Sequence, residues 1–355
     1  MTTEFRRDPI IGHWVLVHTE DSLAPEGYDE GKHTLRQAAI CQFCPGKEYL
    51  TPPEVDAVRD GGSGPNQSGW RVRVISNKFP ALKIEGDINK RLSGMYQLAN
   101  GVGAHEVILE TPEHAKQTAG LSVPELADVI RKYQSRINDL SGDKRFKYII
   151  VFKNYGEAAG ASIEHAHSQI IALPMIPKYV LEELMGTSRY YRQNHRCIYC
   201  DLLQQEYQEK ARIIAENDAF VSLCPFVSRY PFECWVLPRQ HCAKFMSGPI
   251  EEYSKLAKIL SETLQRIKLC LGDPAYNFYL HIPPVNMDGP QAIDQIKSHE
   301  AMSAGTDWLK EYHWHFEIVP KLTYDSGFEW GTGFYVVKTS PEKAAAYLRK
   351  VQIHS

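Results

Sequence analysis

The sequence lacks any long hydrophobic run, and no stretch approaches the roughly 20 apolar residues that a membrane-spanning helix needs. The first eight residues contain no apolar stretch of the kind that begins a secretory signal. An excess of positive charge is also missing, because the 355 residues carry a net charge of −3. Nucleic acid and anionic membrane surfaces are therefore not expected as partners. Together these absences predict a globular cytoplasmic protein.

Cysteine is scarce and unevenly distributed. Of the eight cysteines, four form two Cys-x-x-Cys pairs, Cys41/Cys44 and Cys197/Cys200, and the other four stand alone among mostly apolar neighbours. This distribution is not a disulfide framework. Paired cysteines combined with distant histidines indicate metal sites, and the single cysteines are expected to be small buried side chains.

The chain contains an internal repeat. In each half, a strand pattern ends in a turn with a histidine just beyond it, His114 in the first half and His241 in the second. A proline-started stretch with helical apolar spacing follows, from 124 to about 137 and from 249 to about 267. An aromatic-rich strand pattern and a His-x-His strand complete each half. Two such series in the same order indicate duplication.

The repeat predicts the fold class. We expect an α+β protein of two halves, residues 1–176 and 195–355, each an antiparallel sheet with a helix packed on it. Earlier in each half, residues 74–79 are similar to residues 214–220, and we expect them to form equivalent strands.

Each half supplies two cysteines and two histidines, a donor set that tetrahedral zinc sites commonly use. The expected ligands are Cys41, Cys44, His114 and His165 in the first half, and Cys197, Cys200, His241 and His313 in the second. We expect zinc in both sites, although iron or an empty site remains open for the second. Whether His281 or His315 contributes to the second site also remains open. The alternative of two thioredoxin-like redox pairs is weaker, because neither pair opens a helix after a buried strand.

His165, His167 and Gln169 are expected to lie on one face of a strand, because alternate side chains of a strand share a face. A metal bound to His165 would fix the strand two residues before His167. A neutral imidazole at His167 can attack phosphorus directly. The amide of Gln169 can donate a hydrogen bond but cannot shuttle protons, which favours a covalent intermediate that waits for a second phosphate acceptor. The alternative for His167 is a core histidine satisfied by a carbonyl.

The matching run of the second half ends in Glu317, where the first half has Gln169. A carboxylate at this position would repel a nucleotide phosphate. We therefore expect the second half to be catalytically silent, with His315 as a structural residue or an alternative metal ligand.

These residues resemble the galactose-1-phosphate uridylyltransferase family, in the transferase branch of the histidine-triad superfamily. The resemblance runs nearly end to end, through residues 6–17, 41–46, 72–80 and 327–333, and the His-x-His-x-Gln run is its most specific part. It implies two histidine-triad-like halves and a homodimer with sites near the subunit interface. It also implies a ping-pong reaction in which His167 carries the transferred nucleotidyl group. The simplest such reaction transfers uridylyl between UDP-glucose or UDP-galactose and a hexose 1-phosphate such as galactose 1-phosphate.

The resemblance further implies substrate contacts. The catalytic residues would be His167 and Gln169, with Gln169 bonded to the transferred phosphoryl group. Residues expected to touch the nucleotide and its phosphates are Asn77, Lys78, Asn154, Gly160, Ala161 and Ser162, and Lys153 is a further candidate for neutralising phosphate charge. Residues expected to meet the sugar are Gly327, Phe328 and Glu329.

Two departures from the family pattern concern substrate choice. Residues 19–25 replace an arginine-rich turn, and the glutamine that helps to hold the hexose is missing near residues 331–335. Similar segments occur in relatives that act on ADP-glucose with phosphate, so an ADP-glucose phosphorylase is the main alternative. A hydrolase is disfavoured by Gln169, and a non-catalytic nucleotide-binding zinc protein is the alternative from another class.

Overall fold

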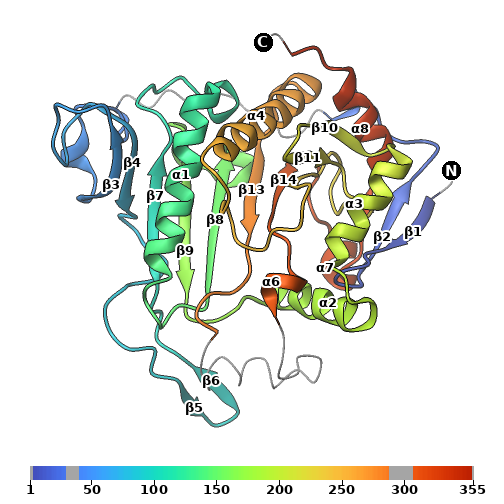
Figure 1. Ribbon diagram of the computed structural model, residues 1–355, viewed down its shortest axis with the longest axis horizontal. Coiled ribbons are helices and arrows are strands. Elements are labelled where there is room, and N and C mark those ends of the chain that lie inside the picture. Colours follow the sequence, from blue (N-terminus) through green and yellow to red (C-terminus); the bar gives the residue numbers. More distant parts are fainter. Residues whose placement is uncertain (1–2, 29–39, 288–306, 354–355) are drawn as a thin grey trace.

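The computed structural model describes residues 3–28, 40–287 and 307–353. Its centre is one antiparallel sheet of ten strands in the order β10-β11-β12-β14-β13-β8-β9-β7-β4-β3 (Figure 1). From one edge to the other, the strands are β10 (Ile213–Glu216), β11 (Phe220–Leu223), β12 (Cys234–Pro238), β14 (His315–Pro320), β13 (Tyr276–His281), β8 (Tyr148–Tyr155), β9 (His167–Leu173), β7 (Ala104–Leu109), β4 (Trp70–Ser76) and β3 (Glu54–Arg59).

The sheet is the product of the duplication. The two halves join where β8 pairs with β13, and Phe152 lies opposite Tyr279 at this junction. Phe152 also lies opposite Gln169, and Tyr279 lies opposite Glu317, so the two residues hold equivalent places. The expected α+β fold with repeated antiparallel halves is confirmed, and the halves share one continuous sheet.

Two long helices cover one face of this sheet, α1 (Val123–Leu140) and α4 (Glu251–Leu271) (Figure 1). Their buried faces repeat the same spacing, with Leu126, Ala127, Val129 and Ile130 in α1 and Leu256, Ala257, Ile259 and Leu260 in α4. A helix with such an apolar stripe gains stability mainly by burying it against a sheet or a second helix. Both predicted helices are therefore confirmed, each a few residues longer than the pattern suggested.

The remaining elements lie around the sheet. Helix α2 (Lys178–Asn194) spans the connection between the expected halves, and α3 (Ile198–Glu209) follows it. A small sheet combines β1 (Thr3–Arg7) and β2 (Trp14–His18) with β15 (Tyr335–Val337), so the beginning of the chain pairs with a late segment. The other elements are the hairpin β5 (Arg91–Ser93) and β6 (Tyr96–Leu98), the helices α6 (Trp308–Glu311), α7 (Gly327–Thr332) and α8 (Pro341–Lys350), and the short helices η1 (Pro25–Gly27), η2 (Glu48–Leu50), η3 (Thr118–Gly120) and η4 (Glu157–Ala159). Within the described ranges, no helix is both long and apolar enough to cross a membrane.

One expected equivalence between the halves is wrong. Residues 74–79 include the end of β4, which pairs with β7 in the first half. In the second half β12 takes the place of β7 and pairs with β11, so β11 is the counterpart of β4. Residues 213–216 instead form β10 at the sheet edge, the counterpart of β3. The similarity of 74–79 to 214–220 arises from a short strand followed by asparagine, a pattern that does not distinguish one strand of a sheet from its neighbour.

Candidate active site and metal centres

The four expected ligands of the first metal site lie together. The Sγ atom of Cys44 is 3.4 Å from Nδ1 of His114 and 3.7 Å from Nδ1 of His165, and the Sγ atom of Cys41 is 3.8 Å from the same nitrogen of His165. Tetrahedral zinc bonds to sulfur and nitrogen would place such atoms about 3.5 Å apart. The donor set and its spacing therefore fit zinc.

The second expected site has the same composition. Sγ of Cys200 is 3.6 Å from Nδ1 of His241 and 3.8 Å from Nδ1 of His313, and with Cys197 these ligand atoms all lie within 4.8 Å of one another. The hydrogen bond from Cys197, together with the two histidines, lowers the pKa of Cys200 to about 3. The same hydrogen bond raises the pKa of Cys197, so Cys200 is the thiolate of the pair, and a thiolate is the form that binds zinc.

In three of the four ligand histidines, His165, His241 and His313, the other ring nitrogen meets a backbone carbonyl. Nε2 of His165 is 2.7 Å from the carbonyl of Thr111, and Nε2 of His313 is 3.0 Å from the carbonyl of Pro238. Because a carbonyl only accepts, each Nε2 carries the proton and each Nδ1 offers its lone pair to a metal. Such second partners orient the rings of metal-binding histidines.

The expectation that His165, His167 and Gln169 share one face of a strand is only partly right. Strand β9 begins at His167, and His165 lies in the irregular segment before it. The backbone bends there because the ring of His165 reaches the cysteines after β2 and the carbonyl of Thr111 instead of the sheet face. His167 and Gln169 do lie on the same face, away from α1.

His167 is held so that one ring nitrogen is available for reaction. Its Nδ1 lies 2.8 Å from the carbonyl oxygen of His165, which requires Nδ1 to carry the hydrogen and leaves the lone pair on Nε2. Burial lowers the pKa of His167 to about 4, with a further contribution from the charge of Lys153. The imidazole is therefore neutral at physiological pH, as a nucleophile must be.

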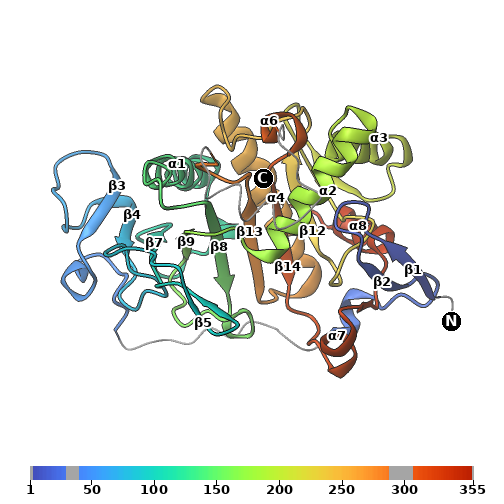
Figure 2. The same cartoon turned by 90° about the horizontal axis from the view of Figure 1, so that it is seen from below.

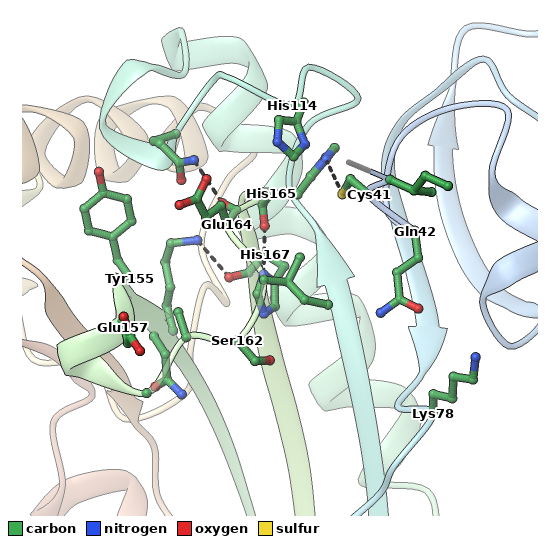
Figure 3. A pocket seen from close by; sticks show the side chains of 18 of the residues that line it. Cys41, Gln42, Lys78, His114, Tyr155, Glu157, Ser162, Glu164, His165 and His167 are labelled. Carbon is green, nitrogen blue, oxygen red and sulfur yellow. Dashed lines mark hydrogen bonds between the residues drawn. The ribbon is translucent and has the colours of Figure 1, made fainter. Parts of the chain in front are cut away.

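A cavity of about 930 Å³ opens beside His167. Figure 3 shows His167 between Gln42 and Lys78 on one side and Glu157 and Ser162 on the other. Gly160 allows the loop of 156–162 to turn back over the cavity, because its φ of 87° is rarely adopted by residues with a side chain. The cavity is large enough for a nucleotide-sized ligand.

Most of the expected nucleotide contacts line this cavity, but not all. The lining includes Lys78, Lys153, Asn154, Gly160, Ala161, Ser162, His165 and His167. Residues that line it and were not predicted to bind substrate include Gln42, Gln117, Tyr155, Gly156, Glu157 and Glu164. Gln42 lies between the paired cysteines and Tyr155 ends β8, while the other four come from segments outside the strands, whose course depends on the fold.

Gln169 and Asn77 lie just outside that lining. Oε1 of Gln169 is 2.7 Å from Nε2 of His105 and 3.4 Å from Nδ2 of Asn77. His105 was not expected at the site, although it stands on β7, the strand that pairs with β9. Gln169, His105 and Asn77 thus continue the line of polar side chains that begins at His167.

The expected sugar contacts lie elsewhere in the chain. Gly327, Phe328 and Glu329 belong to α7, which lies near β2 at the end of the molecule away from β3 and β4 (Figure 2). None of the three lines the cavity beside His167. Within one copy of the chain, these residues and His167 are therefore not brought together.

A third cluster of metal-ligating side chains combines three residues of the second half with one from the connecting helix α2. Glu183 of α2 joins His281, His315 and Glu317, and their ligand atoms all lie within 4.8 Å of one another. His281 and His315 thus stand apart from the Cys197 site, which has four ligands without them. Carboxylates and imidazoles can hold a transition metal, but Arg229 approaches Glu317 to 2.5 Å and competes for one carboxylate.

Comparison with known proteins gives a consistent result. The chain matches the galactose-1-phosphate uridyl transferase N-terminal domain over residues 1–177 and the C-terminal domain of the same family over residues 183–325. It is 33% identical to an ADP-glucose phosphorylase from Arabidopsis thaliana over 99% of this chain and 93% of that protein. A galactose-1-phosphate uridylyltransferase from Thermotoga maritima is 26% identical over 99% of both chains.

A solved structure agrees with the sequence matches. The crystal structure of the ADP-glucose phosphorylase from Arabidopsis thaliana with bound ADP-glucose is 32% identical, covers 100% of both chains and has a TM-score of 0.79. The sequence matches extend over both halves of the sheet and include the His167 strand. The chain therefore belongs to the galactose-1-phosphate uridyl transferase family of nucleotidyltransferases.

Proposed function

We propose that this protein transfers a nucleoside monophosphate from a nucleotide sugar to a second phosphate acceptor through a covalent bond to Nε2 of His167. The observation that carries the proposal is the orientation of that ring, with Nδ1 bound to the His165 carbonyl and the side chain lining a nucleotide-sized cavity. In the first step the Nε2–phosphorus bond forms and the bond from phosphorus to the sugar-phosphate oxygen breaks. In the second step an acceptor phosphate oxygen displaces Nε2, which restores the enzyme.

Gln169 is proposed to protect the intermediate from water. Its amide cannot take a proton from an attacking water molecule at neutral pH, so hydrolysis lacks a general base at this position. An amide nitrogen can still donate a hydrogen bond to a phosphoryl oxygen. Asn77 and His105, which contact Gln169, would orient that amide.

Each Cys₂His₂ set is proposed to hold a zinc ion, whose chemical contribution is structural anchoring of its ligands. In the first site this anchors the segment that carries the His165 carbonyl, which in turn orients His167. The four thiols must remain reduced to bind metal, which suits the proposed location in the cytoplasm.

We favour ADP-glucose as the nucleotide sugar and inorganic phosphate as the acceptor. Support comes from the 33% identical phosphorylase, from the related structure with bound ADP-glucose, and from the two departures at residues 19–25 and 331–335. Uridylyl transfer between UDP-glucose and galactose 1-phosphate is the second candidate, supported by the matched family and by relatives at 26% identity.

We also propose that the active unit is a homodimer whose sites combine residues of both subunits. Helix α7 is exposed, with Phe328 44% and Trp330 79% accessible, and it lies outside the cavity of its own chain. Large exposed aromatic side chains are favoured at protein interfaces. In a symmetric pair, α7 of each subunit can complete the sugar end of the other subunit's site.

The covalent step predicts a labelled protein. Incubation with ADP-glucose or UDP-glucose labelled in the phosphate next to the ribose should leave label on the chain, stable to base and labile to acid as a phosphoramidate is. His167→Ala should retain no label, because the other two histidines that line the cavity, His114 and His165, are assigned to the first metal site. His18→Ala, on β2, is the control and should label like the parent. Equal labelling of His167→Ala and the parent would contradict the proposed nucleophile.

The choice of substrate predicts a difference in kcat/KM. Initial rates with ADP-glucose and phosphate should exceed those with UDP-glucose and galactose 1-phosphate by about tenfold or more, equivalent to about 1.4 kcal/mol of transition-state binding. Both pairs are measured on one preparation at matched concentrations. A faster uridylyl reaction would replace the favoured substrate pair by the second candidate and leave the covalent mechanism in place.

The metal sites predict two separable effects. Cys41→Ser/Cys44→Ser should lose one bound zinc by elemental analysis and slow nucleotidyl transfer by about 100-fold or more, because His165 loses its anchor. Cys197→Ser/Cys200→Ser should lose the other zinc and lower the unfolding temperature, with a much smaller effect on the labelling rate. Full activity in a folded first-site variant without its metal would exclude the anchoring role.

The proposed dimer predicts complementation between two inactive variants. His167→Ala lacks the nucleophile, and Phe328→Ala/Glu329→Ala lacks the sugar contacts. When equal amounts are unfolded and refolded together, half of the dimers should be mixed, and each mixed dimer has one intact site. The mixture should recover about a quarter of the parent's activity, as assayed after co-refolding. Recovery of no activity in verified mixed dimers would place each site within one subunit.

A further inference from the structure

The strand ladder beside the nucleophile is shorter than its counterpart in the second half. Pairing between β8 and β9 ends where Phe152 lies opposite Gln169. The equivalent pair of the second half is Tyr279 opposite Glu317, and there the ladder continues for two more pairs, to His281 opposite His315. His315 therefore has a paired residue on the neighbouring strand, and His167 has none on β8.

A lysine side chain occupies the place of the missing pairing. Nζ of Lys153 donates a hydrogen bond to the carbonyl oxygen of His167 at 2.8 Å. The same ammonium group is 3.1 Å from Oε2 of Glu110, and the two side chains are 1% and 0% exposed. The residue equivalent to Lys153 in the second half is Leu280, which follows Tyr279 as Lys153 follows Phe152.

Glu110 lies between β7 and His114, in a segment that is one residue longer than its counterpart in the second half. Val107 and Trp235 are equivalent, because they lie opposite Gln169 and Glu317, but His114 follows Val107 one position later than His241 follows Trp235. Glu110 lies in this longer segment. Thr118 donates a hydrogen bond to its Oε2 at 2.5 Å, and the hydroxyl of Tyr133 lies 3.3 Å from its Oε1.

The rest of this polar group is also specific to the first half. Tyr133 donates a hydrogen bond to Oγ of Ser168 at 2.8 Å, directly beside His167. Ser168 corresponds to Phe316, which is buried among aromatic side chains. The second half thus fills with apolar side chains the space that the first half fills with a buried ion pair and its hydrogen bonds.

This comparison within one chain argues against a purely structural role. Burying a lysine and a glutamate costs desolvation free energy, and well-packed apolar side chains often stabilise a fold as well or better. Leu280 and Phe316, both buried, show that apolar side chains can fill the equivalent positions in the same sheet. The buried ion pair is found in the half with the open cavity, where Asn154, Tyr155 and Gly156 turn away from β9 and line the cavity wall.

We propose that Lys153, held by Glu110, is a positioning residue for His167. Its ammonium group replaces the strand partner that β8 gives up where it diverges to form the cavity, and it fixes the backbone of the residue that carries the nucleophile. Lys153 lines the cavity, but the two hydrogen bonds of its buried Nζ go to Glu110 and to the His167 carbonyl, so we assign it to holding that backbone. This inference rests on the proposed function, because it assigns a role in forming the His167 intermediate.

The test removes both charges together. Each single change, Lys153→Met or Glu110→Gln, leaves one buried charge without its partner and is expected to reduce the yield of folded protein. Lys153→Met/Glu110→Gln should restore folding, since it removes both charges and keeps an oxygen acceptor for Thr118. Single-turnover labelling by nucleotide sugar should then be slower by about tenfold or more, because a small displacement of a nucleophile has a large effect on rate. The nucleotide-sugar concentration at half-maximal rate should stay within about twofold of the parent's.

Two further variants make the result specific. Lys153→Gln/Glu110→Gln keeps a neutral donor near the carbonyl and should recover most of the labelling rate. Arg136→Met/Glu106→Gln removes another buried ion pair under the same sheet, bonded at 2.7 and 2.8 Å but not to His167, and should leave the rate unchanged.

Three outcomes would overturn the assignment of Lys153. These are a parental rate in the Lys153→Met pair, a weakened apparent affinity without a slower rate, and an equally slow rate in the Lys153→Gln pair. Absence of label in the parent protein would instead reject the proposed function, so the two failures are distinguishable.

Discussion

The hydrogen bond between Nδ1 of His167 and the carbonyl of His165, 2.8 Å long, is the interaction on which the site depends. It fixes the tautomer of the ring and leaves Nε2 as the nitrogen with a free lone pair. The carbonyl is in turn held because the His165 ring is fixed by Cys41, Cys44 and the Thr111 carbonyl. Metal site and nucleophile are only two residues apart, so the orientation of one constrains the other.

The second half repeats this hydrogen bond without the cavity that lies beside His167. Nδ1 of His315 lies 3.2 Å from the carbonyl of His313, which repeats the arrangement of the first half. Nε2 of His315, however, faces a carboxylate oxygen of Glu183 at 3.5 Å, and the ring is fully buried. The expected silence of this half was attributed to Glu317, but Arg229 already pairs with that carboxylate. The structure adds a simpler cause, because α2 places Glu183 where the first half has its cavity.

Features that recur in both halves could be predicted from the sequence, whereas features found in only one half could not. Both ligand sets could be predicted because each recurs in the same order, and α1 and α4 because their apolar spacing recurs. His105, Glu183 and the ion pair of Lys153 with Glu110 have no counterpart in the other half and belong to no motif. Their positions follow from strand register and from the path of α2, which depend on the whole sheet. His165 was misplaced on the strand because a two-residue alternation cannot reveal where a backbone bends.

The two departures from the family pattern lie far apart in sequence, and both adjoin the small sheet of β1, β2 and β15. Residues 19–25 follow β2, residues 331–334 precede β15, and β2 pairs with β15 in the small sheet. Because these strands are parallel, the two segments lie at opposite ends of the pair, and the backbone amide of Leu23 donates to the carbonyl of Lys338, after β15, at 2.8 Å. Leu23 and Tyr335 nevertheless line one cavity of about 470 Å³. None of these residues lines the cavity beside His167. The proposed role of this region in substrate choice would therefore leave the proposed nucleophile and its Cys₂His₂ set unaltered, and that separation would allow one reactive centre to serve different nucleotide sugars.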